Sequence, residues 1–150
     1  MVIYLKKIME YMLVILPLVL GIIVSAFVDF NIYGSLNKPD LAPPAVVFPI
    51  AWTILYVLMG VSLYMNRNNK KKNMVTFFIQ LMLNYLWVFI FFGMQSWLGG
   101  FIVIILLDVM ILYTILEFYK ENKLSAYMMI PYLLWCIFAS YLNFQIFLLN

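Results

Sequence analysis

Five long apolar runs occupy almost the whole of this 150-residue chain and constrain its fold more than any other feature. Each run is close to the roughly 20 residues that an α-helix needs to cross about 30 Å of hydrocarbon. A transmembrane β-barrel would instead show segments of about ten residues with alternating polarity, a pattern that the sequence lacks. The runs therefore predict membrane-spanning helices at residues 8–28, 46–66, 74–92, 99–119 and 125–148.

The composition supports a protein that is solvated by a lipid bilayer. Hydrophobic residues make up 67% of the chain and charged residues 10%, and there is no histidine. A soluble domain of this size would have too little polar surface to cover itself, whereas a membrane protein does not need that surface. We predict an all-α integral membrane protein in which residues 1–150 form a single bundle of five transmembrane helices.

The basic residues collect on one side of this predicted topology. With five spans, the N-terminus and the loops at 67–73 and 120–124 share that side. Lysine and arginine accumulate in short cytoplasmic segments, which predicts a cytoplasmic N-terminus. The C-terminus and the loop at 31–45 would then lie outside. The membrane would be the plasma membrane if the source is bacterial. One short basic loop is too small to bind nucleic acid, so we expect the bilayer as partner. The first side holds Lys6, Lys7, Arg67, Lys70, Lys71, Lys72, Lys120 and Lys123, and the other side holds only Lys38.

The loop between the first two predicted spans is stiffened by proline. Four prolines, Pro39, Pro43, Pro44 and Pro49, fix the backbone angle φ and remove hydrogen-bond donors. The chain before the second span is therefore predicted to be extended and stiff. Residues 31–45 would form a shaped lid that runs directly into an apolar helix.

Three predicted spans each align a tryptophan with polar or small residues at helical spacing. An unsatisfied amide at membrane depth is costly, so the face of the third span with two amides must look inward. The aligned residues are Pro49, Trp52, Tyr56 and Met59 or Gly60; Gln80, Asn84, Trp87 and Phe91; and Pro131, Trp135, Ala139 or Phe138, and Leu142 or Asn143.

A common interior lined in this way suits a large, planar, mostly apolar ligand such as a tetrapyrrole. Aromatic walls provide stacking and burial, while polar anchors such as Tyr56 and Asn84 fix the orientation of the ligand. The alternative is that these aromatic residues only pack the bundle or form belts at the membrane interfaces.

Four spaced motifs occur in order between about residues 30 and 145, and they resemble the TspO/MBR family of tryptophan-rich sensory proteins. This family is related to the mitochondrial translocator protein, or peripheral benzodiazepine receptor. The motifs are Tyr33-x-x-Leu36-x-Lys38-Pro39-x-x-x-Pro43-Pro44; Phe48-Pro49-x-x-Trp52-Thr53-x-Leu55-Tyr56-x-x-Met59-Gly60; Gln80-Leu81-x-Leu83-Asn84-x-x-Trp87; and Pro131-Tyr132-x-x-Trp135-x-x-Phe138-Ala139-x-x-Leu142-Asn143.

The resemblance implies a five-helix protein, usually a homodimer, with a pocket closed by the loop between the first two helices. Family members bind porphyrins such as protoporphyrin IX and haem-related compounds, so the implied ligand is a porphyrin, and no cofactor is required. The matching lid contacts are Tyr33 and Pro44, and the matching pocket contacts are Trp52, Tyr56, Asn84, Trp87, Trp135 and Ala139.

Three classes of function follow from this resemblance. The first is a membrane sensor or transporter-like protein that binds porphyrins or similar planar compounds. The second is an enzyme that degrades porphyrin in light and oxygen, with Trp52 and Trp135 as the catalytic indoles. The third is a membrane scaffold that binds a partner protein and has a vestigial pocket.

The sequence departs from the family pattern at several positions. Ile32 and Leu41 replace tryptophans that are common in the lid, which reduces its aromatic surface. Phe144 occupies the tyrosine position of a proposed sterol motif and no basic residue follows it, so cholesterol binding is not expected. With no histidine, and with Cys136 expected to be a small buried hydrophobic residue rather than a haem ligand, we predict no metal site.

Asp108 is the one carboxylate predicted to lie near the middle of the bilayer. The acidic position common in the family falls on Val103, so Asp108 is not that residue. A carboxylate at this depth costs roughly 2.5 to 3.5 kcal/mol on insertion scales and marks a candidate functional site. We expect it to be protonated or hydrogen-bonded to a helix neighbour, either in a proton or ligand role or in a packing or dimer contact.

Overall fold

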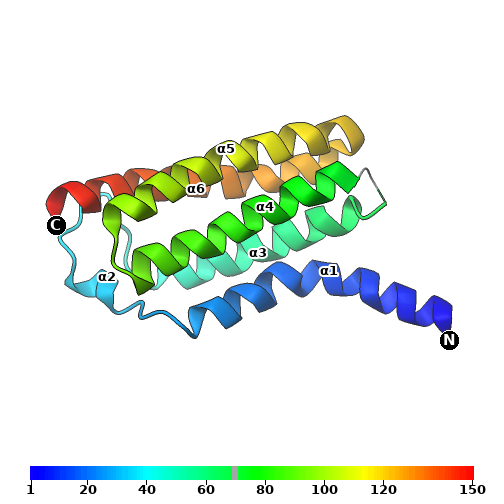
Figure 1. The fold of residues 1–150 in the computed structure, drawn as a ribbon, viewed down its shortest axis with the longest axis horizontal. Coiled ribbons are helices and arrows are strands. Elements are labelled where there is room, and N and C mark those ends of the chain that lie inside the picture. Colours follow the sequence, from blue (N-terminus) through cyan, green and yellow to red (C-terminus); the bar gives the residue numbers. More distant parts are fainter. Residues whose placement is uncertain (69–70) are drawn as a thin grey trace.

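The computed structural model describes residues 1–68 and 71–150, and those residues form helices joined by short loops, with no strand among them (Figure 1). Among the described residues, five helices are long and apolar enough to cross a membrane, which confirms the predicted number of spans. The elements are α1 (Val2–Ser25), α2 (Ile32–Ser35), α3 (Val47–Met65), α4 (Lys71–Val88), the π-helix η1 (Phe89–Gly93), α5 (Trp97–Glu121) and α6 (Lys123–Leu149).

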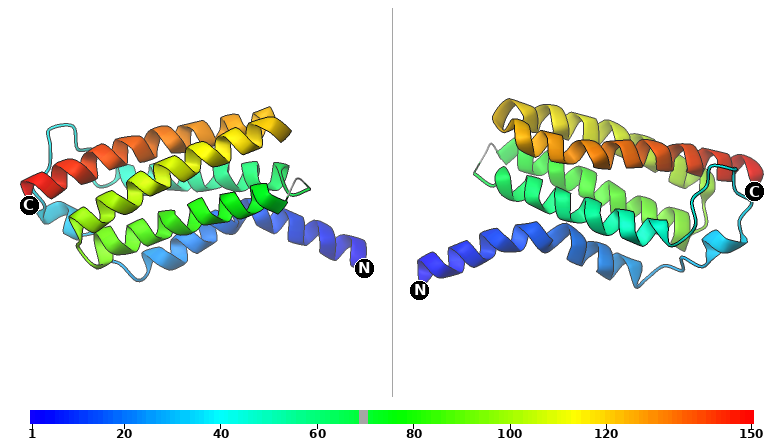
Figure 2. Two further views of the ribbon diagram at one scale, coloured as in Figure 1. Left: turned by 45° about the horizontal axis from the view of Figure 1, so that its top comes forward. Right: turned by 180° about the vertical axis from the view of Figure 1, so that it is seen from behind.

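The four helices α3, α4, α5 and α6 form a bundle, and α1 lies along one side of it. The bundle is held mainly by the packing of α5 on α6, of α4 on α5 and of α3 on α6, while α1 packs chiefly on α3. Figures 1 and 2 show that the N-terminal part of α1 diverges from the bundle. Most of α1 is therefore exposed to the surroundings, as an apolar helix can be in lipid.

The close approach of α1 and α3 depends on a glycine. A Cβ atom added to Gly60 would lie 1.7 Å from the carbonyl oxygen of Val14, so no larger residue fits between the two backbones. Small residues at helix interfaces allow such contacts in membrane proteins. The hydroxyl of Tyr85 on α4 also donates a hydrogen bond to the carbonyl oxygen of Pro17 on α1, at 2.6 Å. These contacts fix the C-terminal part of α1 against the bundle.

The first helix begins and ends earlier than the predicted span at 8–28. It starts at Val2, so the helix extends through Lys6 and Lys7 on the N-terminal side of the apolar run. It ends at Ser25, where the amides of Ala26 and Phe27 donate to carbonyl oxygens three residues back and tighten the last turn. The other four spans differ from the prediction only by a few residues at their ends.

The prolines predicted a lid loop that is extended throughout, but part of the loop is helical. Residues 32–35 form the short helix α2, with the Tyr33 amide donating to the carbonyl oxygen of Phe30 at 3.2 Å. The prolines begin only at Pro39, so the φ restriction that they impose does not reach this turn. The extended prediction is therefore wrong for 32–35, and Leu36, the residue after α2, is extended.

Apart from Lys38 in the lid, the basic residues that the structure describes lie on segments at the end of the bundle opposite the lid and the C-terminus (Figure 1). There Arg67 pairs with Glu10 at 3.0 Å, and Glu117 pairs with Lys120 at 2.6 Å and with Lys72 at 3.7 Å. Lys70, which the charge argument also assigns to this end, lies outside the described residues. The structure thus agrees with the clustering, while the cytoplasmic orientation of this end stays a prediction.

Candidate functional site

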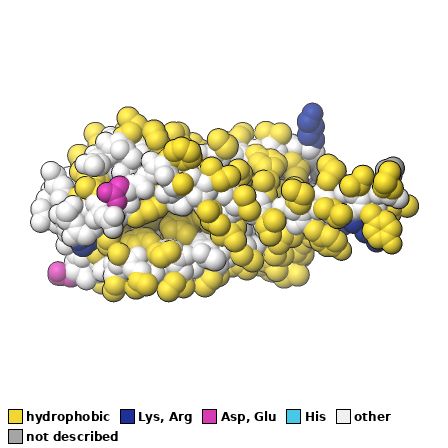
Figure 3. Space-filling view, turned by 90° about the horizontal axis from the view of Figure 1, so that it is seen from below, with side chains coloured by type: hydrophobic (Ala, Val, Ile, Leu, Met, Phe, Trp, Pro, Cys, Tyr) yellow, Lys and Arg dark blue, Asp and Glu magenta, His cyan; other side chains and the backbone are white. Residues whose placement is uncertain are grey.

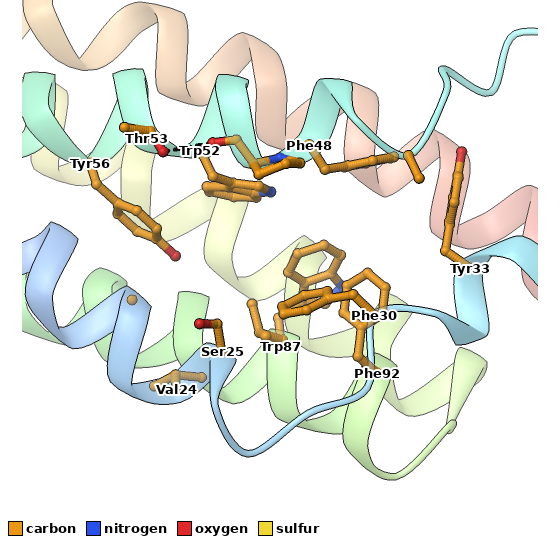
Figure 4. Close-up of a pocket in the computed structure, with 14 residues that line it drawn as sticks. Val24, Ser25, Phe30, Tyr33, Phe48, Trp52, Thr53, Tyr56, Trp87 and Phe92 are labelled. Atoms are coloured by element: carbon orange, nitrogen blue, oxygen red, sulfur yellow. Dashed lines mark hydrogen bonds between the residues drawn. The ribbon is translucent and has the colours of Figure 1, made fainter.

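A cavity of about 410 Å³ lies at the lid end of the bundle, between α1, α3, the junction of α4 with η1, and the lid loop. Figure 3 shows that the face carrying α1 is largely hydrophobic and is hollowed toward the lid end. Fourteen residues line the cavity (Figure 4): Gly21, Val24, Ser25, Phe30, Tyr33, Ala45, Phe48, Pro49, Trp52, Thr53, Tyr56, Trp87, Val88 and Phe92.

Two tryptophans form the main aromatic wall of the cavity. Trp52 comes from α3 and Trp87 from α4, and their ring centroids are 6.1 Å apart with an angle of 39° between the planes. Tyr56 stacks on Trp52 one helical turn away, at 5.5 Å and 29°. Phe92 from η1 meets Trp87 edge-on at 6.1 Å. These contacting rings present a continuous aromatic surface across two helices (Figure 4).

The inner end of the cavity is closed by Tyr56, which is held from both sides. Its buried hydroxyl donates a hydrogen bond to Oδ1 of Asn84 at 2.7 Å. On the other side, a Cβ atom added to Gly21 of α1 would lie 2.6 Å from the Tyr56 ring, so glycine gives the ring the space that it occupies. Asn84 itself is fully buried behind Tyr56 and does not line the cavity.

A group of buried polar atoms behind Tyr56 has no hydrogen-bond partner among the described residues. They are Nδ2 of Asn84 and Oε1 of Gln80 on α4, and the hydroxyl of Tyr132 on α6. Gln80 Nε2 lies 3.9 Å from the sulfur of Met59, which is a weak contact. Unsatisfied polar atoms are costly inside a membrane protein, and these atoms form a polar layer beneath the aromatic cavity.

The lid is fixed over the mouth of the cavity by Tyr33. The Tyr33 ring packs edge-on against Phe48 at 4.9 Å, and its hydroxyl donates to the carbonyl oxygen of Pro43 at 2.9 Å. The ammonium of Lys38 donates to the carbonyl oxygens of Tyr33 at 2.8 Å and of Leu36 at 3.0 Å. Burial raises the pKa of the Tyr33 phenol, so it remains a neutral donor at physiological pH.

The chemistry of the lining is apolar and uncharged. None of the fourteen lining residues carries a charge. The hydroxyls of Ser25 and Thr53 donate to carbonyl oxygens of their own helices, Ile22 at 2.6 Å and Pro49 at 2.7 Å, which leaves only acceptor lone pairs free. Among residues 1–68 and 71–150 there is no group of three metal-ligating side chains. Shape and ring stacking therefore dominate what this cavity offers to a ligand.

The structure brings together only part of the residue set named from the sequence. Tyr33, Trp52, Tyr56 and Trp87 line the cavity, and Asn84 lies behind Tyr56. The remaining three do not line it. Ala139 lines a second, small cavity of about 20 Å³. Trp135 packs against the lining residue Phe48, with 6.0 Å between the two ring centroids. Pro44 is exposed and precedes the lining residue Ala45.

Sequence reasoning missed the contribution of α1 and of several phenylalanines. Gly21 and Ser25 are four residues apart on an apolar helix, which was a signal for close contact but not for a ligand site. Phe48 belongs to one of the motifs described above, but it is not among the residues aligned on the helix faces. Phe92 lies on η1, and a π-helical turn of this kind is frequent at functional sites but cannot be read from the sequence.

Comparison with known proteins agrees with this architecture. Residues 13–149 match the model of the TspO/MBR family. The chain is 45% identical over 122 residues to the Tryptophan-rich protein TspO of Archaeoglobus fulgidus, covering 79% of each chain. It is 44% identical over 124 residues to the protein of the same name from Chlorobaculum tepidum, covering 79% of this chain and 78% of the relative.

A more distant match extends to animals. The chain is 30% identical over 123 residues to the Translocator protein of Bos taurus, covering 77% of this chain and 73% of the relative. The match to the family model includes all of the cavity-lining residues described above. The chain therefore belongs to the TspO/MBR family and is an integral, multi-pass membrane protein.

Proposed function

We propose that this protein binds a planar, largely apolar tetrapyrrole of the porphyrin type in the cavity beneath the lid, as a membrane sensor or transporter-like protein. The observation that carries the proposal is the contact between Trp52 and Trp87, which joins α3 and α4 into one aromatic wall. Flat rings gain most from offset or edge-to-face contact with such a wall, beyond the area that they bury.

The size and polarity of the cavity support the same ligand class. Its volume of about 410 Å³ falls within the range of about 300 to 1,000 Å³ that is typical of small-molecule sites. An anionic substituent would be costly against the uncharged lining, so a ligand that carries carboxylates would keep them at the lid end, near water. The macrocycle would then face Trp52 and Trp87, with its polar edge toward Tyr33.

Ligand binding is favoured over photo-oxidation by the placement of two tryptophans. The enzymatic alternative uses both Trp52 and Trp135 beside the porphyrin. Only Trp52 lines the cavity, whereas Trp135 does not line it and packs against the lining residue Phe48. The proposal takes the homodimer from the family resemblance, and the outside position of the lid end from the distribution of basic residues.

The test is a titration of the detergent-solubilised protein with protoporphyrin IX, followed by tryptophan fluorescence. We expect saturable quenching in the native protein. In Trp52→Phe and Trp87→Phe, the dissociation constant should rise about tenfold, since an aromatic contact contributes up to about 1.5 kcal/mol. Trp97→Phe is the matched control, because Trp97 packs against Phe91 but does not line the cavity.

Three results would count against the proposal. One is quenching that rises linearly with porphyrin and never saturates, which indicates partition into the detergent micelle. Another is an equal dissociation constant in the native protein and in a protein that combines Trp52→Phe with Trp87→Phe. A loss of affinity in the Trp97→Phe control as large as in the two wall variants would show that the cavity is not the binding site.

A further inference from the structure

The side-chain amide of Asn143 connects three helices of the bundle. Asn143 lies on α6 and is 1% exposed. Its Oδ1 accepts a hydrogen bond from Nε1 of Trp87 on α4, at 3.0 Å, and its Nδ2 donates to the carbonyl oxygen of Trp97 at the start of α5, at 2.7 Å. The amide thus has a donor and an acceptor partner at once, whereas the amides of Gln80 and Asn84 each keep one atom without a partner among the described residues.

A glycine on α5 makes room for this amide. A Cβ atom added to Gly100 would lie 2.9 Å from Oδ1 of Asn143 and 3.3 Å from the ring of Phe91. Any side chain at position 100 would therefore displace the oxygen that accepts from Trp87. Three helices together fix the position of the Asn143 side chain. Such support is expected of a residue that holds another residue in place.

The hydrogen bond determines which part of Trp87 faces the ligand cavity. Trp87 separates the large cavity beneath the lid from the small cavity of about 20 Å³, and Asn143 lines only the small one. The polar edge of the indole is therefore turned toward α6. What remains for the large cavity is the apolar ring, which packs against Trp52 and Phe92.

We propose that Asn143 is a positioning residue that holds the Trp87 indole with its N–H turned away from the cavity, so that this wall selects a ligand by its flat face rather than by a hydrogen-bond acceptor. The consequence for ligands rests on the proposed function, whereas the orientation of the indole does not. Without Asn143, the buried N–H would lack a partner, and the ring would turn toward whichever acceptor it can reach.

The indole of Trp135 is an internal reference for the hydrogen bond between Trp87 and Asn143. Nε1 of Trp135 is also buried, but it has no partner among the described residues. In a ¹H–¹⁵N spectrum of the native protein, the indole N–H of Trp87 should therefore lie downfield of that of Trp135 and exchange more slowly with deuterium. The two signals are assigned from Trp87→Phe and Trp135→Phe. Equal shifts and equal exchange rates in the native protein would overturn the proposal without any further variant.

Variants at two positions then test the cause. Asn143→Leu should move the Trp87 signal upfield and leave the Trp135 signal unchanged. Asn143→Asp should keep the Trp87 signal downfield, because the protonated carboxyl group still accepts from Trp87 through one oxygen and can donate to the Trp97 carbonyl oxygen through its hydroxyl. Gly100→Ala should also move the Trp87 signal, although it alters neither partner, whereas Gly34→Ala should not, because nothing lies within 4 Å of that position. An unmoved Trp87 signal in both Asn143→Leu and Gly100→Ala would overturn the proposal.

The consequence for binding is tested by titration with protoporphyrin IX. Asn143→Leu should raise the dissociation constant about tenfold, as expected when a hydrogen bond that orients a contact residue is lost. Asn143→Asp should restore most of the affinity. Asn73→Leu is the control for the loss of a buried amide, because Asn73 lies on α4 and is not among the residues that line either cavity.

The two parts of the proposal can fail separately from the proposed function. If Asn143→Leu shifts the Trp87 signal but binds porphyrin as well as Asn73→Leu does, the role in ligand selection is overturned. If the native protein binds no porphyrin at all, the proposed function fails, and the spectra still decide the orientation of Trp87.

Discussion

The hydroxyl of Tyr56 on α3 donates a hydrogen bond to Oδ1 of Asn84 on α4, at 2.7 Å, within the buried interior of the bundle. Nδ2 of Asn84 has no partner among the described residues, so this hydrogen bond engages only the oxygen of the amide. The pair joins the inner end of the cavity to the polar layer behind it. It therefore affects the stability of the bundle and the shape of the cavity together.

Tyr56→Phe should destabilise the protein by about 1 to 3 kcal/mol, because it leaves the amide of Asn84 entirely unsatisfied. Asn84→Leu removes the amide and leaves the Tyr56 hydroxyl unpaired instead. The double variant should be less destabilised than the sum of the two single variants, since it removes both members of the pair and leaves neither without its partner. Thermal unfolding in detergent measures all three, and strict additivity would show that the hydrogen bond contributes nothing.

Gly60→Ala should destabilise the packing of α1 on α3 strongly. The added methyl group would lie 1.7 Å from the Val14 carbonyl oxygen, which is backbone and cannot rotate away. We expect a loss of about 3 kcal/mol, at the upper end of the range for overpacked sites. Gly34→Ala is the matched control, because nothing lies within 4 Å of that Cβ position.

The measurement for Gly60→Ala is the unfolding midpoint in one detergent for both variants. A more specific readout is limited proteolysis of the N-terminal segment, because α1 should separate from the bundle before α3 to α6 unfold. Equal midpoints and equal cleavage rates in Gly60→Ala and Gly34→Ala would contradict the close approach of the two helices.

The helices and half of the cavity wall could be predicted from the sequence, because both depend on local patterns. Runs of apolar residues determine where a chain can cross a bilayer, and three-or-four spacing places Trp52 and Tyr56 on one face of a helix. The same spacing placed Trp135 and Ala139 on one helix face, although Ala139 lines the small cavity and Trp135 lines neither cavity. Four residues advance about 40° beyond a full turn, so two aligned residues can face different grooves once the neighbouring helices are in place.

The contribution of α1 could not be predicted, for a different physical reason. From Met12 to Val24 its sequence is apolar all around, so no polar face marks the side that meets the bundle. Gly21 lines the cavity only because α1 packs on α3, a long-range contact that depends on Gly60. Likewise, the hydrogen bond between Trp87 and Asn143 joins residues 56 positions apart, which no local pattern encodes.

The lid is connected to the end of the chain by two asparagines. The amide nitrogen of Asn37 donates to Oδ1 of Asn150 at 3.0 Å, and Nδ2 of Asn150 donates to the carbonyl oxygen of Asn37 at 2.9 Å. These bonds are exposed, so Asn150→Ala should lower the stability by only about 0.5 to 1.5 kcal/mol. The lid should open more often, since loops held by few buried contacts open at low free energy.

The expected effect of Asn150→Ala is thus kinetic. Porphyrin should dissociate about tenfold faster, with a smaller change in the association rate, because most changes of affinity appear in the dissociation rate. Stopped-flow displacement of bound protoporphyrin IX measures this rate. Ser35→Ala is the control within the lid, because its hydroxyl bonds only to the carbonyl oxygen of Ile32 in the same helical turn. Equal dissociation rates in the two variants would show that the Asn37–Asn150 contact does not hold the lid.

Asp108 on α5 accepts a hydrogen bond from the hydroxyl of Ser140 on α6, at 2.6 Å, while its Oδ1 is buried without a partner among the described residues. Asp108 is not among the residues that line either cavity. The contact therefore favours the packing alternative for this residue over a ligand role. A half-satisfied buried carboxylate is costly, and replacing such groups by apolar residues of similar volume is often neutral or stabilising.

We expect Asp108→Leu combined with Ser140→Ala to raise the stability by about 1 kcal/mol, because the pair then packs without an unsatisfied oxygen. Ser140→Ala alone should lower the stability, since it removes the one partner found for the carboxylate. Unfolding in detergent measures both variants. The dissociation constant for protoporphyrin IX should stay within about twofold of the native value, a change of less than 0.5 kcal/mol. If binding is lost while the double variant remains folded, Asp108 acts on the ligand, and the packing role is wrong.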